Sequence, residues 1–136
     1  MIRRFKIGNL VRDKMPERIK KLGGYVNVQT LNPQDYLHYL KLKLQEETDE
    51  ILAATTPKDV KEEIADVLEV LHALAKKYGL LWEHIEKKRL HKLGERGGFN
   101  KALYAEFVEA EESEDSDTPH PVIEYCLSSP EKYPEV

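Results

Sequence analysis

The sequence predicts a mainly α-helical protein: an antiparallel helical bundle with a small two-stranded β element and an irregular C-terminal tail. The first observation is that apolar residues recur at helical spacing over two long stretches, about 33–54 and 57–78. The second is that each stretch begins with a capping residue followed by proline, Asn32 before one and Thr56 before the other. The third is the very short turn between them, which makes the two helices antiparallel neighbours.

Shorter elements are expected on either side of this helix pair. A short helix, "PERIKKL", opens at Pro16 and ends at the glycines 23–24. The stretch 25–31, "YVNVQTL", alternates and is rich in β-formers, which predicts a strand. A third helix is expected from about Trp82 to Glu95, ended by glycines 97–98.

The C-terminal part is expected to be less regular. Residues 101–110 could pair with 25–31 as a second strand, with helix as the alternative. Residues 109–117 are strongly acidic and predict a solvated linker. The final stretch holds four of the seven prolines, which favours a tail without regular structure. We therefore expect a domain over 1–108 followed by an acidic linker and proline-rich tail over 109–136.

Composition limits the classes of function. The chain has 136 residues, which suits one domain, and its net charge of −4 does not favour nucleic-acid binding. Cys126 is the single cysteine, so no intrachain disulfide can form and a reducing compartment is expected. Neither a signal peptide nor a membrane-spanning apolar run is recognisable. The expectation is a cytoplasmic protein that binds neither membranes nor nucleic acid.

Acidic residues crowd the first long helix at "KLQEETDEI", residues 43–51. At 100° per residue, Glu47 lies about −60° from Leu44 on the apolar stripe, and Glu50 lies at about −120°, on its edge. Lys43 shares that flank at about −100°, while Glu46 is further out at about −160°. Glu47 and Glu50 are therefore expected to face the partner helix.

The second long helix carries a matching pair of acids in "KEEIADVLE", residues 61–69. Measured from Val67, Glu63 lies at about −40° and Asp66 at about −100°. Antiparallel packing along the two stripes can bring the four carboxylates together. Converging buried carboxylates repel one another unless they are protonated or paired with a cation, and Mg²⁺ is the hard cation expected there. Periodicity alone also allows the alternative of acids at a solvated helix edge.

A row of cations follows on the third helix. Arg89, Lys92 and Arg96 share the side of Trp82 and Ile85 at helical spacing. Such a row can complement an acidic site or bind phosphates. The alternative is that the aliphatic stems pack while the charged groups remain in water.

Four motifs together resemble a known group of enzymes. "KLQEETDEI" followed by "EEIADVLEVLHAL" is similar to the metal-binding signature of the all-alpha nucleoside triphosphate pyrophosphohydrolase superfamily, which includes the MazG-like proteins. "NLVRDKMPERI" and "KKRLHKLGERGGF" resemble its small phosphoribosyl-ATP pyrophosphohydrolase-like subgroup. The resemblance covers about residues 9–108, and the acidic linker and tail have no counterpart in it.

This resemblance implies a reaction and roles for particular residues. The reaction is Mg²⁺-dependent hydrolysis, with Mn²⁺ as a substitute, of a nucleoside triphosphate to monophosphate and pyrophosphate, often to remove unwanted nucleotides. A homodimer or homotetramer is also implied. Glu46 would orient or deprotonate the attacking water. The implied metal ligands are Glu47, Glu50, Glu63 and Asp66, and the candidate phosphate contacts are Arg12, Lys14, Lys43, Arg89, Lys92 and Arg96.

Two other interpretations remain. Glu69 and His72 match the Glu-x-x-His motif of carboxylate-bridged di-iron bundles, but both lie on the solvent side of their helix and the motif has no second copy. The second interpretation keeps the helical fold without catalysis, as a nucleotide-binding or assembly module.

Overall fold

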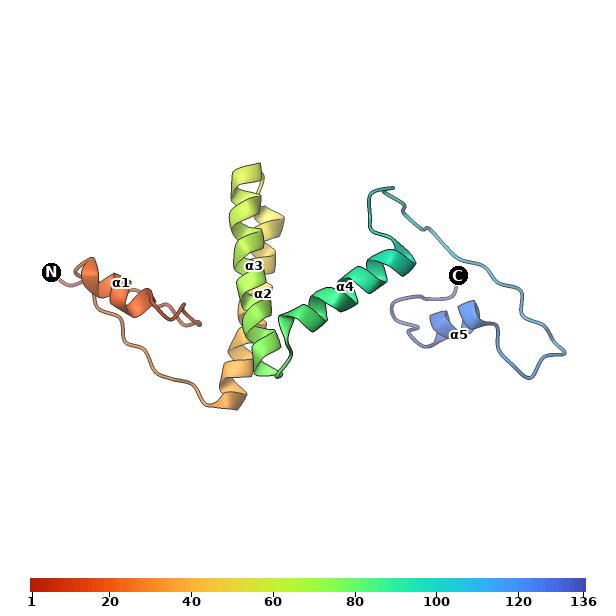
Figure 1. The fold of residues 1–136 in the computed structure, drawn as a ribbon, viewed down its shortest axis with the longest axis horizontal. Helices are drawn as coiled ribbons and strands as arrows, with labels where there is room; N and C mark the ends of the chain where they lie inside the picture. The colour runs from red at the N-terminus through yellow and green to blue at the C-terminus, as the bar shows by residue number, and fades with distance from the viewer. The chain divides into compact units, whose positions relative to one another are not determined.

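The computed structural model describes residues 1–136 and confirms a mainly α-helical chain (Figure 1). The chain divides into two compact units, Met1–Glu95 and Arg96–Val136. None of the helices is both long and apolar enough to cross a membrane. The helices are α1 (Met15–Lys21), α2 (Pro33–Ala53), α3 (Pro57–Lys77), α4 (Trp82–Arg96) and α5 (Pro121–Leu127).

Helices α2 and α3 lie side by side and form the principal packed pair of the chain (Figure 1). Both predicted caps are present: the Asn32 side chain accepts a hydrogen bond from the Asp35 amide at 2.8 Å, and Thr56 accepts one from Asp59 at 3.1 Å. Each cap satisfies an amide that has no partner within the helix. Only residues 54–56 connect the helices, so the chain reverses direction at once. The structure thus shows an antiparallel helical pair, and the larger bundle stays a prediction.

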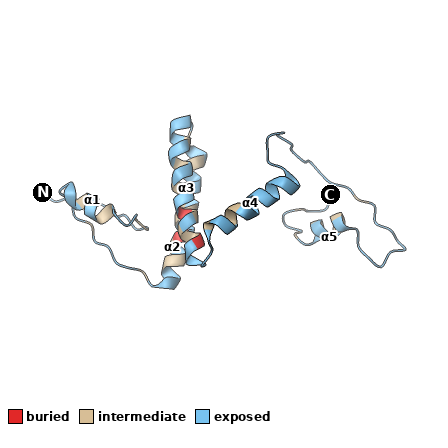
Figure 2. Cartoon of the chain, viewed as in Figure 1, coloured by how far each residue is buried: buried red, intermediate tan, exposed pale blue.

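The core is small and sits between α2 and α3 (Figure 2). Its buried apolar residues are Leu40, Val70 and Ala75. At helical spacing Ile64 lies about +60° from Val67 and is expected on the apolar stripe of α3, but it is 47% exposed in the structure. Val70 lies about −60° from Val67, so the buried face is turned toward the side that carries the acids. This rotation helps to bring the α3 acids to the α2 interface.

The predicted β element does not form. The structure contains no strand, and both 25–31 and 102–110 lack regular secondary structure. A strand requires a neighbour to accept and donate its backbone hydrogen bonds, and neither stretch has one. The alternation at 25–31 therefore corresponds to a largely exposed connection between α1 and α2.

The C-terminal tail is more regular than predicted, because it contains α5. The His120 ring nitrogen Nδ1 accepts a hydrogen bond from the Val122 amide at 3.2 Å, and Pro121 begins the helix. Proline is favoured at a first helical position, so a proline-rich stretch can still start a helix. The acidic run 109–117 has no helix or strand, as expected of a linker. The proposed boundary at 108 stays a prediction, while packing divides the chain after Glu95.

Candidate metal centre

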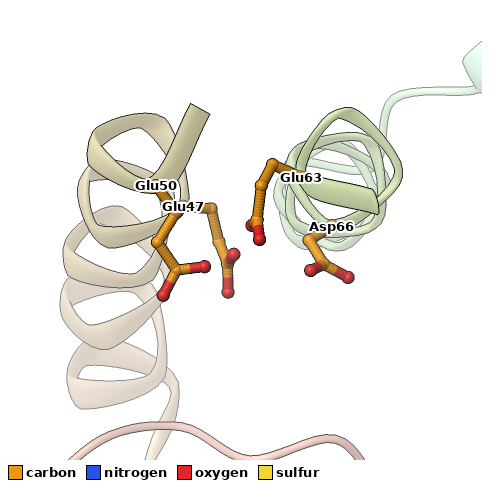
Figure 3. A group of neighbouring side chains, drawn as sticks. All are labelled: Glu47, Glu50, Glu63 and Asp66. Carbon is orange, nitrogen blue, oxygen red and sulfur yellow. The ribbon is translucent and has the colours of Figure 1, made fainter. Parts of the chain in front are cut away.

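Four carboxylates come together between α2 and α3 (Figure 3). One oxygen from each side chain can be chosen so that all four atoms lie within 4.8 Å of one another. Each helix supplies two acids spaced three residues apart, which places them on neighbouring turns of one face. The contributing residues are Glu47 and Glu50 of α2, and Glu63 and Asp66 of α3.

The burial of these acids follows the helical geometry. Glu47 lies on the apolar stripe and is only 7% exposed, whereas Glu50 at the edge is exposed. Glu63 and Asp66 are half-buried. The cluster is therefore closed on the Glu47 side and open to solvent on the Glu50 side. A cation could enter from the open side and retain water or a ligand there.

Two oxygens within the cluster have no hydrogen-bond partner. They are Oε2 of Glu47 and Oε2 of Glu63, and both are buried. A buried polar atom without a partner costs free energy, and the cost is larger for a charged group. In native structures such atoms are usually paired with protein groups, ordered water or an ion. These two oxygens, one from each helix, are the strongest local indication that the cluster accommodates a ligand.

The pKa values of the α2 acids reflect the crowding. Burial raises the pKa of Glu47 above 4.5, and its contact with Glu50 raises it further, against the opposing charge of Lys43. The pKa of Glu50 is also raised, chiefly by the neighbouring carboxyl group of Glu63. Both shifts mean that ionising these groups costs more in the folded protein than in a free side chain. A bound cation would reverse this preference, because it stabilises the charged form.

The donor set indicates the kind of cation that would fit. All four groups are carboxylates, and neither histidine nor cysteine belongs to the cluster. Oxygen ligands suit hard divalent ions such as Mg²⁺, Mn²⁺ and Ca²⁺, whereas zinc and copper sites usually include nitrogen or sulfur. The residues present therefore fit the ion expected from the sequence.

Glu46 lies beside the four-acid cluster but does not belong to it. Its Oε2 accepts hydrogen bonds from Lys43 Nζ and from Asn9 Nδ2, each at 3.4 Å. Lys43 also lies 3.5 Å from Oε1 of Glu47, so it connects Glu46 to the cluster. The outer position expected for Glu46 agrees with its side chain being 40% exposed. Sequence reasoning missed Asn9, although it begins the quoted "NLVRDK" motif.

Of the remaining predicted phosphate contacts, only Arg12 touches the cluster. Its Nη2 donates to Oδ1 of Asp66 at 2.7 Å. Lys14 and Lys92 are exposed and form no side-chain hydrogen bond or ion pair. Arg89 is engaged by Glu86 of its own helix, with Nε 3.0 Å from the carboxylate. Arg96 belongs to the second unit of the chain.

A separate hollow lies along α4. It has a volume of about 440 Å³ and includes two of the predicted cations, Arg89 and Lys92. The structure adds two residues that the predicted row did not include, His84 and Lys88. The hollow is lined by Leu80, His84, Ile85, Lys88, Arg89 and Lys92.

The di-iron interpretation finds no support in the structure. Glu69 and His72 are exposed and lie outside the acid cluster. The His72 ring instead stacks on Trp82, with ring centroids 3.6 Å apart. This contact joins α3 to the start of α4 and gives His72 a structural role.

The fold and the site define a mainly α-helical chain with a grouped set of four acids that could hold a hard cation. Comparison with known proteins adds no assignment: no protein-family model, no curated protein and no solved structure matches the chain.

Proposed function

We propose that this chain is an Mg²⁺-dependent nucleoside triphosphate pyrophosphohydrolase that releases a nucleoside monophosphate and pyrophosphate. The proposal rests on the resemblance of its motifs to that superfamily. One observation carries it further: four acids, predicted as ligands from the sequence, lie within 4.8 Å of one another. The removal of non-canonical or excess nucleotides is the biological role that the resemblance implies.

The reaction requires little covalent chemistry from the protein. A bound divalent ion supplies charge neutralisation for the triphosphate, with Mg²⁺ or Mn²⁺ held by Glu47, Glu50, Glu63 and Asp66. The protein must position a water for attack on one phosphorus and accept its proton. The bond broken is the phosphoanhydride bond between the α- and β-phosphates, and pyrophosphate leaves.

Glu46 is the proposed proton acceptor. Lys43 and Asn9 both donate to its Oε2, which orients the carboxylate and leaves Oε1 without either of these donors. Oε1 can then accept a hydrogen bond from the attacking water. Since the side chain is partly exposed, a proton taken from that water can pass on to solvent.

Two basic residues beside the cluster are the best-placed partners for phosphate. Lys43 and Arg12 each contact one of the four acids. Both can neutralise charge that develops on the phosphate oxygens. Lys14, Arg89, Lys92 and Arg96, the last in the second unit of the chain, remain further candidates for phosphate contact from the resemblance.

We also propose that the chain assembles with copies of itself into a homodimer or homotetramer. Only three apolar residues are buried, whereas several large ones on the helix pair remain exposed. Exposed apolar surface of this kind favours association. The residues concerned are Leu42, Leu52, Ile64 and Leu68. Light scattering of the purified protein would test this, and a monomer at micromolar concentration would contradict it.

The proposed activity is tested with a panel of nucleoside triphosphates in Mg²⁺, measuring pyrophosphate release. We expect release from at least one member, lost in Asp66→Asn and retained in Glu69→Gln. Glu69 is the matched control, because it is an exposed acid three residues along the same helix, outside the cluster. Tight nucleotide binding without any pyrophosphate would instead support the non-catalytic binding module.

A further inference from the structure

A short N-terminal segment reaches the acids of both helices. This segment, residues 9–12, is called the strap. Asn9 at its start donates to Glu46 of α2, and Arg12 at its end donates to Asp66 of α3. Between them, Leu10 and Val11 are half-buried, whereas residues 1–9 are exposed. The strap thus makes one polar contact with each helix of the pair, through Asn9 and Arg12.

Backbone geometry positions the Arg12 side chain. Gly8 has a φ of +65°, a conformation that residues with a Cβ adopt only with strain, and it turns the chain just before the strap. After the strap, the Met15 amide donates to the Arg12 carbonyl at 2.9 Å, which begins the turn into α1. Arg12 is therefore held between two turns, and its side chain extends to Asp66.

Arg12 gives Asp66 a partner that the buried oxygens of the cluster lack. Oδ1 of Asp66 lies 2.7 Å from the guanidinium, whereas Oε2 of Glu47 and Oε2 of Glu63 have no partner at all. Lys43 also faces the cluster, but it belongs to α2 and contacts Oε1 of Glu47 at 3.5 Å. Asp66 is thus the acid whose carboxylate is engaged by a cation from outside the helix pair.

We propose that Arg12 competes with the divalent cation for Asp66, so that the strap weakens cation binding until Arg12 is released. This inference rests on the metal site of the proposed function. Glu47, Glu50 and Glu63 can receive the cation first, and Asp66 joins them as Arg12 leaves. The released guanidinium then lies beside the site, where an anionic phosphate can take the place of Asp66 as its partner.

The size of the effect follows from the exposure of the pair. The side chain of Arg12 is 61% exposed and that of Asp66 is 37% exposed, so water screens their attraction. Exposed ion pairs of this kind change an equilibrium by about two- to fivefold. Removing Arg12 should therefore tighten cation binding by about two- to fivefold. A residue that merely stabilised the site would have the opposite effect when removed.

The test measures Mn²⁺ binding to the full chain without nucleotide, from the electron paramagnetic resonance signal of free Mn²⁺. The variants are Arg12→Ala and Arg12→Gln, which both remove the charge, with folding checked by circular dichroism. Arg18→Ala is the matched control, because Arg18 is an exposed cation of the adjoining helix α1 and forms no side-chain ion pair. This control measures how the loss of one positive charge changes Mn²⁺ binding while the contact between Arg12 and Asp66 is kept.

Tighter Mn²⁺ binding in both Arg12 variants, with Arg18→Ala unchanged, would support competition. Equal or weaker binding in the Arg12 variants would overturn it, as would an equal gain in Arg18→Ala. In either of these two cases the wild-type protein still binds Mn²⁺ and the metal site stands. If neither the wild type nor any variant binds millimolar Mn²⁺, the metal site fails, and both the proposed function and this inference fail with it.

Discussion

Replacing Glu47 by glutamine should stabilise the protein in EDTA and strongly reduce its stabilisation by Mg²⁺. Glutamine has nearly the same shape, so it occupies the same place without a charge. Two unit charges 4.8 Å apart, the limit of the cluster, repel each other by about 0.9 kcal/mol in water and about 3.5 kcal/mol at an effective dielectric constant of 20. Lys43 loses one attraction in the variant but keeps Glu46 as a partner.

The relief of charge repulsion in Glu47→Gln falls in the lower part of this range of about 0.9 to 3.5 kcal/mol, because Glu50 is exposed. The lost attraction between Glu47 and Lys43 offsets some of the gain. We expect a net stabilisation of about 1–2 kcal/mol at pH 7. For a chain of 136 residues this raises the melting temperature by about 3–7 °C, since the unfolding entropy is about 2.1 cal/mol/K per residue. Thermal unfolding followed by circular dichroism in EDTA measures the shift.

The dependence on pH follows from the direction of the pKa shift. The pKa of Glu47 is raised above 4.5 in the folded protein by burial and by Glu50, so the folded state holds this proton more tightly than the unfolded state. Stability in EDTA therefore falls as the pH rises from about 4.5 through the raised pKa, and the penalty is complete above it. Glutamine lacks this titration, so the advantage of Glu47→Gln should disappear below about pH 4.5.

Adding Mg²⁺ should invert the comparison. A ligand at a hundred times its dissociation constant stabilises the folded protein by about 2.7 kcal/mol, and the wild type should gain accordingly. Glu47→Gln should gain much less, because it lacks one ligand and its charge. The exposed control Glu69→Gln should behave as the wild type. A Glu47→Gln protein that is less stable than the wild type in EDTA, or that gains equally from Mg²⁺, would refute this account.

Three further variants test the helix pair and the proposed base. Thr56→Ala should lower the free energy of unfolding by about 1 kcal/mol through loss of the N-cap, whereas the exposed neighbour Thr55→Ala should have little effect in urea unfolding. Leu40→Ala should lower the free energy of unfolding by about 2–4 kcal/mol. Leu42→Ala, at a site 47% exposed, should lower it by less than about 1 kcal/mol. Similar losses in the two variants would contradict the described core. Glu46→Gln should lower kcat for pyrophosphate release by about a hundredfold or more. Mn²⁺ binding should be unchanged in this variant. Weaker Mn²⁺ binding would instead identify Glu46 as a metal ligand.

The sequence was sufficient for the elements whose signals are local. Asn32 and Thr56, each followed by proline, predicted helix starts that the structure confirms by hydrogen bonds to Asp35 and Asp59. The i, i+3 spacing also placed Glu47 on the interface, where it is 7% exposed. Caps and helical periodicity act over a few residues, so they can be recognised without knowing the rest of the fold.

Signals that need a partner were misleading. The alternation at 25–31 predicted a strand, but a strand exists only if another segment completes its hydrogen bonds, and none does. The prolines of the C-terminal stretch indicated irregular structure, although Pro121 begins α5. The strand preference was real but found no partner, whereas the prolines were misinterpreted, because proline also favours the first position of a helix.

By itself, the sequence determined helices α1 to α4, the antiparallel connection of α2 and α3, and the four acids on or beside their facing sides, because each follows from spacing along one chain segment. Only the tertiary structure decided the rotation of α3 about its own axis. That rotation buries Val70 rather than Ile64, and the packing of α3 on α2 leaves oxygens of Glu47 and Glu63 without partners. The tertiary structure alone placed Arg12 against Asp66, 54 positions away in the sequence. Contacts over such separations depend on packing between elements, and helical periodicity carries no information about them.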